Sequence, residues 1–247
     1  MTAISGTTTL VGIIGHPVAH SLSPAMQNAG FAAAGLDWAY VPLAVPAARV
    51  ADAVQGLVAL GFAGANVTIP HKGAVIEHCD EVDSVAEAAG SVNTLVVRDG
   101  RVLGSSTDIV ALQQAVDARG LRVLVLGRGG AARAAEAAYT AQSAAAVDSA
   151  SRRDAAWPPD ASGYDVVVNC TPVKDAPLVA LRQELAVIDM AYNSDRSPTA
   201  LVQAAQAAGC AVVVDGLRLL LAQGVASFER WTGMQAPTAA MAAALGL

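Results

Sequence analysis

A short apolar run that ends in a glycine turn constrains the fold of this chain more than any other feature. Arg122–Leu126 has the composition of a buried strand, Gly127-Arg128-Gly129-Gly130 follows at once, and the alanine-rich stretch Ala131–Ala141 favours a helix. Glycines in such a turn let the backbone approach a phosphate, and a helix N-terminus attracts anions. A lone G-x-G-G is weak, but between a strand and a helix it predicts a dinucleotide-binding unit.

The rest of the chain alternates β-branched runs with alanine-rich stretches, a pattern typical of α/β folds with mainly parallel strands. The other expected strands are Leu10–Ile14, Ala39–Leu43, Gly64–Thr68, Thr94–Arg98, Arg101–Gly104, Ala144–Ser149, Val166–Asn169, Val187–Asp189 and Ala211–Val214. The other expected helices are Pro24–Ala34, Ala47–Leu60, Asp83–Ala89, Thr107–Gly120, Ala200–Ala208 and the stretch from Leu217 to the end. Asp154–Gly163, which contains Pro158-Pro159, is expected to be a loosely structured loop.

Composition narrows the classes of protein. The 247 residues suffice for one large domain or two small ones. No apolar run reaches the roughly 18 to 20 residues that span a bilayer, and Met1–Thr9 lacks the features of a signal peptide. Three scattered cysteines indicate reduced thiols, and a net charge of −6 argues against nucleic acid as the main partner. We therefore expect a soluble cytoplasmic protein.

Four short polar segments stand at expected strand ends, where α/β folds present their chemistry. They are Gly15–Pro24, Asn66–Lys72, Ser91–Leu95 and Ser105–Asp108. A single lysine at a strand end is most often solvated surface, and a lysine with an aspartate is most often an ordinary surface pair. Four such segments together predict a polar site.

These segments resemble the shikimate dehydrogenase family, and the resemblance covers essentially the whole chain. Gly15–Pro24 contains a match to H-S-x-S-P, and Asn66–Lys72 is similar to N-V-T-x-P-x-K. Further matches follow in order at Gly127–Ala131, Asn169–Pro172, Asp189–Tyr192 and Gln223. The resemblance implies a two-domain α/β protein. Residues 1–105 and 217–247 would form an α/β substrate domain, and residues 106–216 a Rossmann-like NADP-binding domain, with a C-terminal helical return to the first domain.

The resemblance also implies an oxidoreductase that interconverts a 3-dehydroshikimate-like ketone and its alcohol with NADP(H). Reduction of a ketone needs a hydride and a proton; Lys72 would donate the proton and Asp108 would orient it. The implied substrate residues are Ser21, Ser23, Thr68, Asn93, Tyr192 and Gln223. The implied cofactor residues are Gly127, Gly129, Gly130, Ala131, Ser151, Arg152, Arg153, Thr171, Met190 and Gly216. We expect no metal, since His16, His20 and His71 fit no compact ligand set.

Several residues keep a second interpretation. Ser23 would cap the helix that begins near Pro24 as well as contact a substrate carboxylate, and Asn93 could instead stabilise a turn. Ser151-Arg152-Arg153 follows the second strand of the nucleotide domain and favours the 2′-phosphate of NADP over NAD. Asp148 is the competing acid, but it lies inside the expected strand.

The chain departs from the family mainly on the cofactor side. Arg128 replaces the usual Ala, Lys174 and Arg218 replace Gly, and Ser106-Thr107-Asp108-Ile109 stands where Asn-Thr-Asp-Gly is usual. The new cations could tighten cofactor binding, and the bulkier side chains could narrow the nicotinamide pocket. Quinate or an aminoshikimate as substrate, a non-catalytic binding protein, NAD as cofactor, and a monomer or homodimer all remain open.

Overall fold

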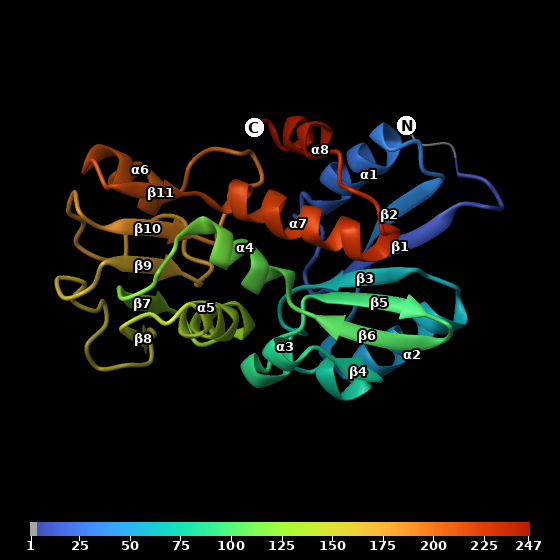
Figure 1. Cartoon of the computed structure of the whole chain (residues 1–247), viewed down its shortest axis with the longest axis horizontal. Helices are drawn as coiled ribbons and strands as arrows, with labels where there is room; N and C mark the ends of the chain where they lie inside the picture. The colour runs from blue at the N-terminus through green and yellow to red at the C-terminus, as the bar shows by residue number, and fades with distance from the viewer. Residues whose placement is uncertain (1–3) are drawn as a thin grey trace. The chain divides into compact units, whose positions relative to one another are not determined.

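The computed structural model describes residues 4–247 and divides into two compact units (Figure 1). The first unit ends at Thr107 and resumes at Leu221–Leu247, and the second is Asp108–Leu220. Residues 1–3 of the predicted substrate domain lie outside the described residues. Among the described residues, none of the helices is long and apolar enough to cross a membrane.

The first unit is built on a six-stranded mixed sheet in the order β2-β1-β3-β5-β6-β4. Its strands are β1 (Thr9–Gly15), β2 (Trp38–Ala44), β3 (Gly64–Val67), β4 (Glu81–Val82), β5 (Thr94–Arg98) and β6 (Arg101–Ser105). Strands β1, β2 and β3 are parallel, whereas β5 is antiparallel to both β3 and β6. The parallel strands bring the ends of β1 and β3 to one edge of the sheet.

Helices of the first unit come from both ends of the chain. They are α1 (Ser23–Ala33), α2 (Val50–Ala59), α3 (Ser84–Ala89) and α8 (Thr238–Leu245), with the 3-10 turns η1 (Ala47–Arg49) and η2 (Ile76–His78) and all but the first turn of α7 (Gly216–Thr232). Helix α8 lies beside α1 (Figure 1), and the rings of Phe31 and Phe228 stack with centroids 5.3 Å apart. The C-terminal segment therefore completes the first core.

The second unit is built on a five-stranded, wholly parallel sheet in the order β11-β10-β9-β7-β8 (Figure 1). Its strands are β7 (Arg122–Leu126), β8 (Ala146–Ala150), β9 (Val166–Asn169), β10 (Ala186–Asp189) and β11 (Val212–Val214), and its helices are α4 (Thr107–Ala115, from Asp108 on), α5 (Gly130–Ala141) and α6 (Ala200–Ala207). The strand order changes direction at β7, where β8 and β9 lie on either side. Such a switch point is the usual ligand position in parallel sheets.

The connection from β8 to β9, residues 151–165, contains no helix or strand, in agreement with the loop expected at Asp154–Gly163. Helices normally cover the sheet in such crossovers. Here Ala161 belongs to the same buried apolar cluster as Leu124 and Val167 of the sheet, and Trp157 and Tyr164 pack against that cluster. The loop thus takes the place of a crossover helix.

Two helices end earlier than the sequence suggests. Helix α4 stops at Ala115 rather than at Gly120, because the Gln142 side chain takes over its last hydrogen bonds. Its Nε2 donates to Gln113 O at 2.8 Å, and its Oε1 accepts from Ala118 N at 3.0 Å. The C-terminal stretch is broken between α7 and α8, where Gly233 adopts a φ of +67°.

Candidate active site

The parallel strands β1 and β3 end together and bring two of the polar segments side by side. Their register pairs Ile14 with Val67. Beyond the strands, Thr68 N donates to Ile14 O at 2.9 Å, and His16 N donates to Ile69 O at 3.0 Å. The loop that leads to Ser21 and Ser23 therefore starts beside Thr68.

The start of helix α1 differs from the prediction for Ser23. The helix begins at Ser23 itself, its N-cap is Leu22, and no side chain caps it. Ser23 as a helix cap is therefore wrong, because a first helical residue is not in the N-cap position. The Ser21 hydroxyl instead accepts the Ser23 N–H at 3.2 Å. Contact of both serines with a carboxylate stays a prediction.

The backbone of the Lys72 loop is fixed from both sides. His71 is 1% exposed, and its Nε2 lies 2.6 Å from Val45 O. Val92 N donates to Lys72 O at 2.9 Å. Lys72 itself is half-buried. These bonds attach the loop that carries Lys72 to the segment that carries Asn93.

Asn93 organises the start of helix α4. Its Oδ1 accepts from Thr107 N at 2.7 Å and from the Thr107 and Thr94 hydroxyls, each at 3.1 Å. These bonds give Asn93 a structural role at the start of α4, 14 positions further along the chain, whereas its role in a turn of its own stays a prediction. Asp108 follows Thr107 in the chain and is 6% exposed, so Asn93 fixes the backbone immediately before the predicted catalytic carboxylate.

A buried polar network connects this segment to α7. Asn66 Nδ2 donates to Asn93 O, Thr94 Oγ1 and Ser227 Oγ at 3.0–3.1 Å, and Asn66 Oδ1 accepts from the Tyr40 hydroxyl at 2.8 Å. The Ser227 hydroxyl bonds to Gln223 O at 2.9 Å, one turn back in α7. The network thereby positions the backbone at Gln223, a predicted substrate residue.

Sequence reasoning gave the network no role. Asn66 was visible only as the first residue of its motif, and Thr94 only as a member of the polar segment Ser91–Leu95 and of the strand that begins there. Ser227 was a small residue in a stretch expected to be helical, four positions after Gln223. That spacing places both on one helix face and was the one signal available.

Two buried polar atoms in this unit have no hydrogen-bond partner among the described residues: Gln27 Oε1 and Ser106 Oγ. Gln27 Nε2 is satisfied by Gly224 O at 2.9 Å. Buried polar atoms in native proteins nearly always have a partner, so an orphan marks a position suited to bonding a water or ligand. Ser106 adjoins Thr107 at the centre of the network.

In the second unit, the glycine turn between β7 and α5 has the backbone that phosphate binding needs. Gly127 has a φ of +126°, and a Cβ there would lie 3.2 Å from Cys170 O. Helix α5 begins after Gly129 with no side-chain cap and no acidic residue in its first turn. A Cβ on Gly129 would meet nothing within 4 Å, so the approach to the helix N-terminus is open. The turn fits a dinucleotide phosphate.

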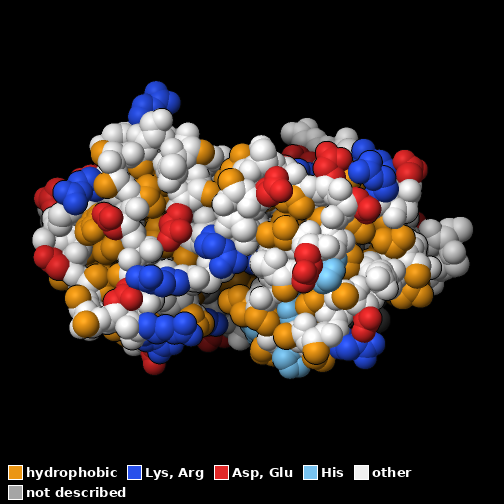
Figure 2. Space-filling view, turned by 90° about the horizontal axis from the view of Figure 1, so that it is seen from below, with side chains coloured by type: hydrophobic (Ala, Val, Ile, Leu, Met, Phe, Trp, Pro, Cys, Tyr) orange, Lys and Arg blue, Asp and Glu red, His pale blue; other side chains and the backbone are white. Residues whose placement is uncertain are grey.

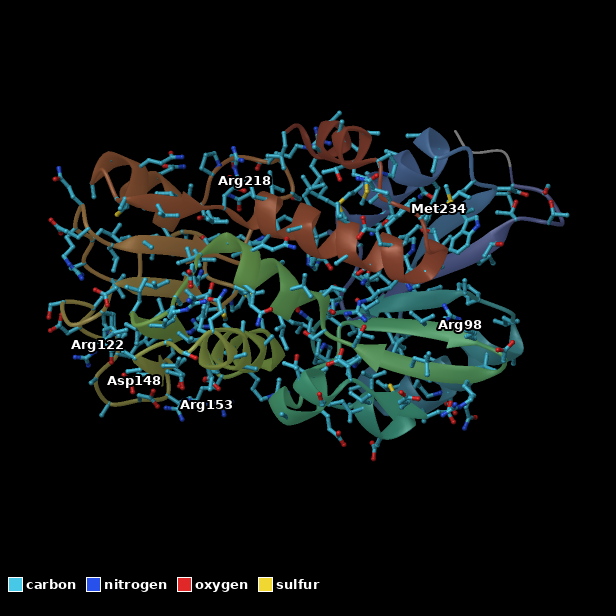
Figure 3. All side chains as sticks on the ribbon, viewed as in Figure 1. Arg98, Arg122, Asp148, Arg153, Arg218 and Met234 are labelled. Atoms are coloured by element: carbon cyan, nitrogen blue, oxygen red, sulfur yellow. The ribbon has the colours of Figure 1, made fainter. Side chains whose placement is uncertain are left out.

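Ser151–Asp154, which we call the arginine turn, follows β8. Asp154 N donates to Ser151 O at 2.9 Å, and Asp154 Oδ2 accepts from Ser151 N at 2.8 Å. Arg152 and Arg153 occupy the two middle positions and are exposed; Arg153 lies at the turn beyond β8 in Figure 3. The competing acid Asp148 lies inside β8 and accepts from the Tyr164 hydroxyl at 3.1 Å.

The ends of β9 and β10 are held by two buried side chains. Asn169 Oδ1 accepts from the backbone and hydroxyl of Thr171, and its Nδ2 donates to Asp189 Oδ1 at 2.9 Å. Asp189 also accepts from Ala191 N at 2.9 Å and the Thr199 hydroxyl at 2.5 Å. Burial raises the pKa of Asp189, and these hydrogen bonds oppose that shift.

Predicted cofactor and substrate residues follow these strands directly. Thr171 follows β9, and Met190 and Tyr192 follow β10. Gly216 opens α7 against the same loop, where a Cβ would lie 2.2 Å from Ala191 O, so no larger residue fits. All strands of this sheet are parallel, so their carboxyl ends lie on the same side of the sheet. The predicted cofactor residues Thr171, Met190 and Gly216 each follow the carboxyl end of a strand.

The three unexpected cations each have a nearby partner. Arg128 bonds to Asp154 at 2.9 Å, and Arg218, which Figure 3 labels, lies 3.6 Å from Asp215. Lys174 Nζ lies 5.9 Å from the centre of the Tyr192 ring. Within residues 4–247, no three His, Cys, Asp or Glu side chains are grouped so that they could hold a metal ion.

Comparison with known proteins identifies the family. Residues 13–95 match the shikimate dehydrogenase substrate binding domain, and residues 216–245 match the shikimate 5′-dehydrogenase C-terminal domain. The NADP(+)-dependent shikimate dehydrogenase of Methanothermobacter thermautotrophicus is 39% identical over 278 aligned positions, covering 98% of this chain and 97% of the relative. The chain belongs to the shikimate dehydrogenase family.

Solved structures agree on the fold. A shikimate 5-dehydrogenase from Thermus thermophilus, in complex with NADP(H) and shikimate, superposes with a TM-score of 0.84 at 30% identity, covering 96% of this chain and 98% of that one. A ligand-free 5-ketofructose reductase from a Gluconobacter strain superposes with a TM-score of 0.83 at 31% identity, covering 98% and 99%. The predicted α/β class with a Rossmann-like part is confirmed.

Proposed function

We propose that this chain reversibly reduces 3-dehydroshikimate to shikimate with NADP(H). The observation that carries the proposal is the hydrogen-bonded arrangement around Asn93. It fixes the Lys72 loop and the backbone before Asp108 within a family whose curated relatives are NADP-dependent shikimate dehydrogenases.

Lys72 is the proposed proton donor. The sequence has two lysines. Lys72 lies in the first unit, and Lys174 lies in the second. The Lys72 ammonium protonates the oxygen that becomes the alcohol, and in the reverse direction the amine accepts that proton. Asp108 is the proposed residue that orients the ammonium. The bound cofactor supplies the hydride, so Lys72 and Asp108 handle only the proton.

The remaining proposed substrate contacts divide by chemistry. Ser21, Ser23 and Tyr192 carry hydroxyls suited to a carboxylate. Thr68, Asn93 and Gln223 carry hydroxyl or amide groups suited to ring hydroxyls. Most of these side chains are shielded from solvent, which favours the exclusion of water around such a polar ligand. Ser21 and Thr68 are half-buried, and Ser23, Asn93 and Gln223 are buried.

For the cofactor, we propose that Gly127, Gly129, Gly130 and Ala131 hold the pyrophosphate at the N-terminus of α5. The open approach at Gly129 supports this assignment. Ser151, Arg152 and Arg153 would hold the adenosine ribose with its 2′-phosphate, which makes NADP preferred over NAD. Thr171, Met190 and Gly216 would line the nicotinamide.

A second candidate is a close analogue of shikimate, such as quinate or an aminoshikimate. One observation favours it. Ser106 is 4% exposed, and its hydroxyl has no partner among the described residues, at a position where the family usually has Asn. The 5-ketofructose reductase neighbour acts, by its name, on another ketone, so the fold alone does not fix the substrate.

The test is a spectrophotometric assay of nicotinamide reduction with shikimate, quinate and an aminoshikimate, each with NADP and with NAD. Fastest turnover of shikimate with NADP is expected. Faster turnover of quinate or the amino compound would support the second candidate. Binding of shikimate and NADP without turnover by any pair would show a binding protein instead.

We further propose that the protein works in the cytoplasm, with no nucleic-acid partner, as a monomer or homodimer. The net charge of −6 supports the absence of a nucleic-acid partner. Light scattering coupled to gel filtration distinguishes monomer from homodimer, and a larger assembly would contradict both.

A further inference from the structure

An ion pair joins the glycine turn to the arginine turn. Strands β7 and β8 are parallel neighbours, with Leu126 opposite Ala150. Gly127 N donates to Ala150 O at 2.7 Å. Just beyond, Arg128 Nη2 donates to Asp154 Oδ2 at 2.9 Å. Arg128, which has no role in the family pattern, is therefore held against the loop proposed to bind the adenosine ribose.

Asp154 has two structural tasks. The oxygen that receives Arg128 also accepts the N–H of Ser151. The Ser151 N–H and the Arg128 guanidinium together keep the pKa of Asp154 below its ordinary value. One carboxylate thus bonds to the backbone of the arginine turn and to the Arg128 side chain.

Positive charge exceeds negative charge at this edge. The arginine turn contains Arg152 and Arg153 and is paired with Arg128, whereas Asp154 is the one carboxylate among its four residues. Figure 2 shows several Lys and Arg side chains on the displayed face of the second unit, with Asp and Glu side chains among them. A phosphate dianion would balance such a surplus.

The ion pair leaves Arg128 able to bind a ligand. The two side chains are 58% and 33% exposed, and exposed pairs contribute little free energy. A guanidinium has five N–H donors in a planar fork, and the bond to Asp154 occupies one. The other N–H groups can donate to a phosphate while the bond to Asp154 remains, because guanidinium groups bind phosphate in a bidentate manner.

We propose that Arg128 is a specificity-determining residue that binds the 2′-phosphate of NADP, and that Asp154 is its positioning residue. This inference rests on the proposed function in requiring that the second unit bind NADP. It adds a third arginine, from a different loop, to the two expected from the sequence. Arg128 would thereby strengthen cofactor selection at the position where the family usually has Ala.

The test measures binding rather than turnover. Isothermal titration calorimetry at one low salt concentration compares adenosine 2′,5′-bisphosphate with 5′-AMP, which differ only in the 2′-phosphate. We expect Arg128→Ala to weaken binding of the bisphosphate about tenfold, the scale of one charged hydrogen bond, and to change binding of 5′-AMP less than about twofold. Arg128→Gln should behave alike and guards against a folding defect in the alanine variant.

Arg119→Ala is the matched charge control. Arg119 is exposed and precedes the amino end of β7, whereas Arg128 follows the carboxyl end of that strand. Its removal should leave both affinities unchanged. An equal loss for both ligands in Arg128→Ala would place Arg128 on another phosphate and overturn the proposal, as would no loss for either.

A double-mutant cycle tests the role of Asp154. Asp154→Asn keeps an oxygen acceptor for Ser151 N and removes the charge that holds Arg128. If Asp154 positions Arg128, the cost of Arg128→Ala for the bisphosphate should shrink in the Asp154→Asn background. An unchanged cost would remove the positioning role. A wild-type protein that binds NADP but not the bisphosphate would overturn only this inference, whereas one that binds neither would overturn the proposed function too.

Discussion

The network around Asn66 and the arginine turn are built in opposite ways. Asn66, Thr94, Thr107 and Ser227 are at most 4% exposed and bond mainly to one another. In the arginine turn, by contrast, Arg152 and Arg153 are exposed, and the turn depends on a few bonds to Ser151 and Asp154. A change in the network therefore disturbs the fold and the substrate side together. A change in the turn can alter ligand preference alone.

Three of the expected departures from the family pattern agree with this difference. Arg128, Lys174 and Arg218 all lie on loops or helix starts of the second unit. Such positions tolerate substitution because little packing depends on them. In the first unit the one departure inside the network's neighbourhood, Ser106, has a hydroxyl without a partner among the described residues.

The largest expected effect comes from Lys72. Lys72→Ala should lower turnover by a factor of about 100 or more, the usual contribution of a positioned acid–base group, with little change in cofactor affinity. Steady-state kinetics measures turnover, and titration with NADP measures affinity. Arg98→Ala is the control, since Arg98 is an exposed cation of the same unit to which no role is assigned. Turnover within a few-fold of wild type would remove Lys72 from the mechanism.

The next largest effect is expected in the arginine turn and concerns the preference for NADP over NAD. Replacing Arg152 and Arg153 together by Ala should shift preference from NADP toward NAD by about tenfold to a hundredfold, because each charged hydrogen bond contributes about 1.5 to 3 kcal/mol. The melting temperature should not change, since both side chains are exposed. kcat/KM for both cofactors at one salt concentration gives the ratio. A wild-type enzyme that prefers NAD would overturn the assignment.

A smaller effect is expected at Ser23. Ser23→Ala should weaken substrate binding by about 1.5 kcal/mol, or about tenfold, as for a hydrogen bond to a charged group. Because Ser23 is not the helix cap, the melting temperature should remain close to that of wild type. The matched ligand is an analogue without the carboxylate, for which the loss should be far smaller. Equal losses for both ligands would show that Ser23 does not bind the carboxylate.

The smallest effect tests whether the network couples fold and site. Ser227→Ala removes a hydroxyl bonded to Asn66, Thr94 and Thr107, which should cost about 1 kcal/mol of stability and lower Tm by about 2 to 4 °C. Substrate KM should rise in the same variant. Ser84→Ala, an exposed change in the same unit, is the control. A lower Tm with unchanged KM would show that the network stabilises the fold without affecting substrate binding.

Much of the fold could be predicted because its signals are local. β-Branched runs indicated every strand except the two-residue β4, and the glycine turn indicated the strand–turn–helix of the second unit. Helix ends were predicted less well. The Gln142 side chain ends α4 from a position 27 residues beyond Ala115, and no sequence pattern announces that contact.

The site divides in the same manner. Motif residues such as Lys72 and Asn93 could be named from the sequence, and their catalytic and binding roles stay predictions. The bonds that fix them could not be foreseen, because Asn66 and Ser227 are 161 positions apart and meet only in the folded unit. Ser23 shows the converse, since a local capping rule failed when the helix began one residue earlier than the rule required.

The return of the chain to the first unit has a consequence for biosynthesis. Phe228 stacks on Phe31, and α8 packs beside α1, yet these partners lie in Leu221–Leu247, after all of the second unit. A ribosome makes the chain from its N-terminus, and domains generally fold as they emerge. The core that begins first must therefore wait for the last residues, whereas Asp108–Leu220 is contiguous and can fold as soon as it leaves the exit tunnel. The order of folding during synthesis is thus the reverse of the order in the sequence.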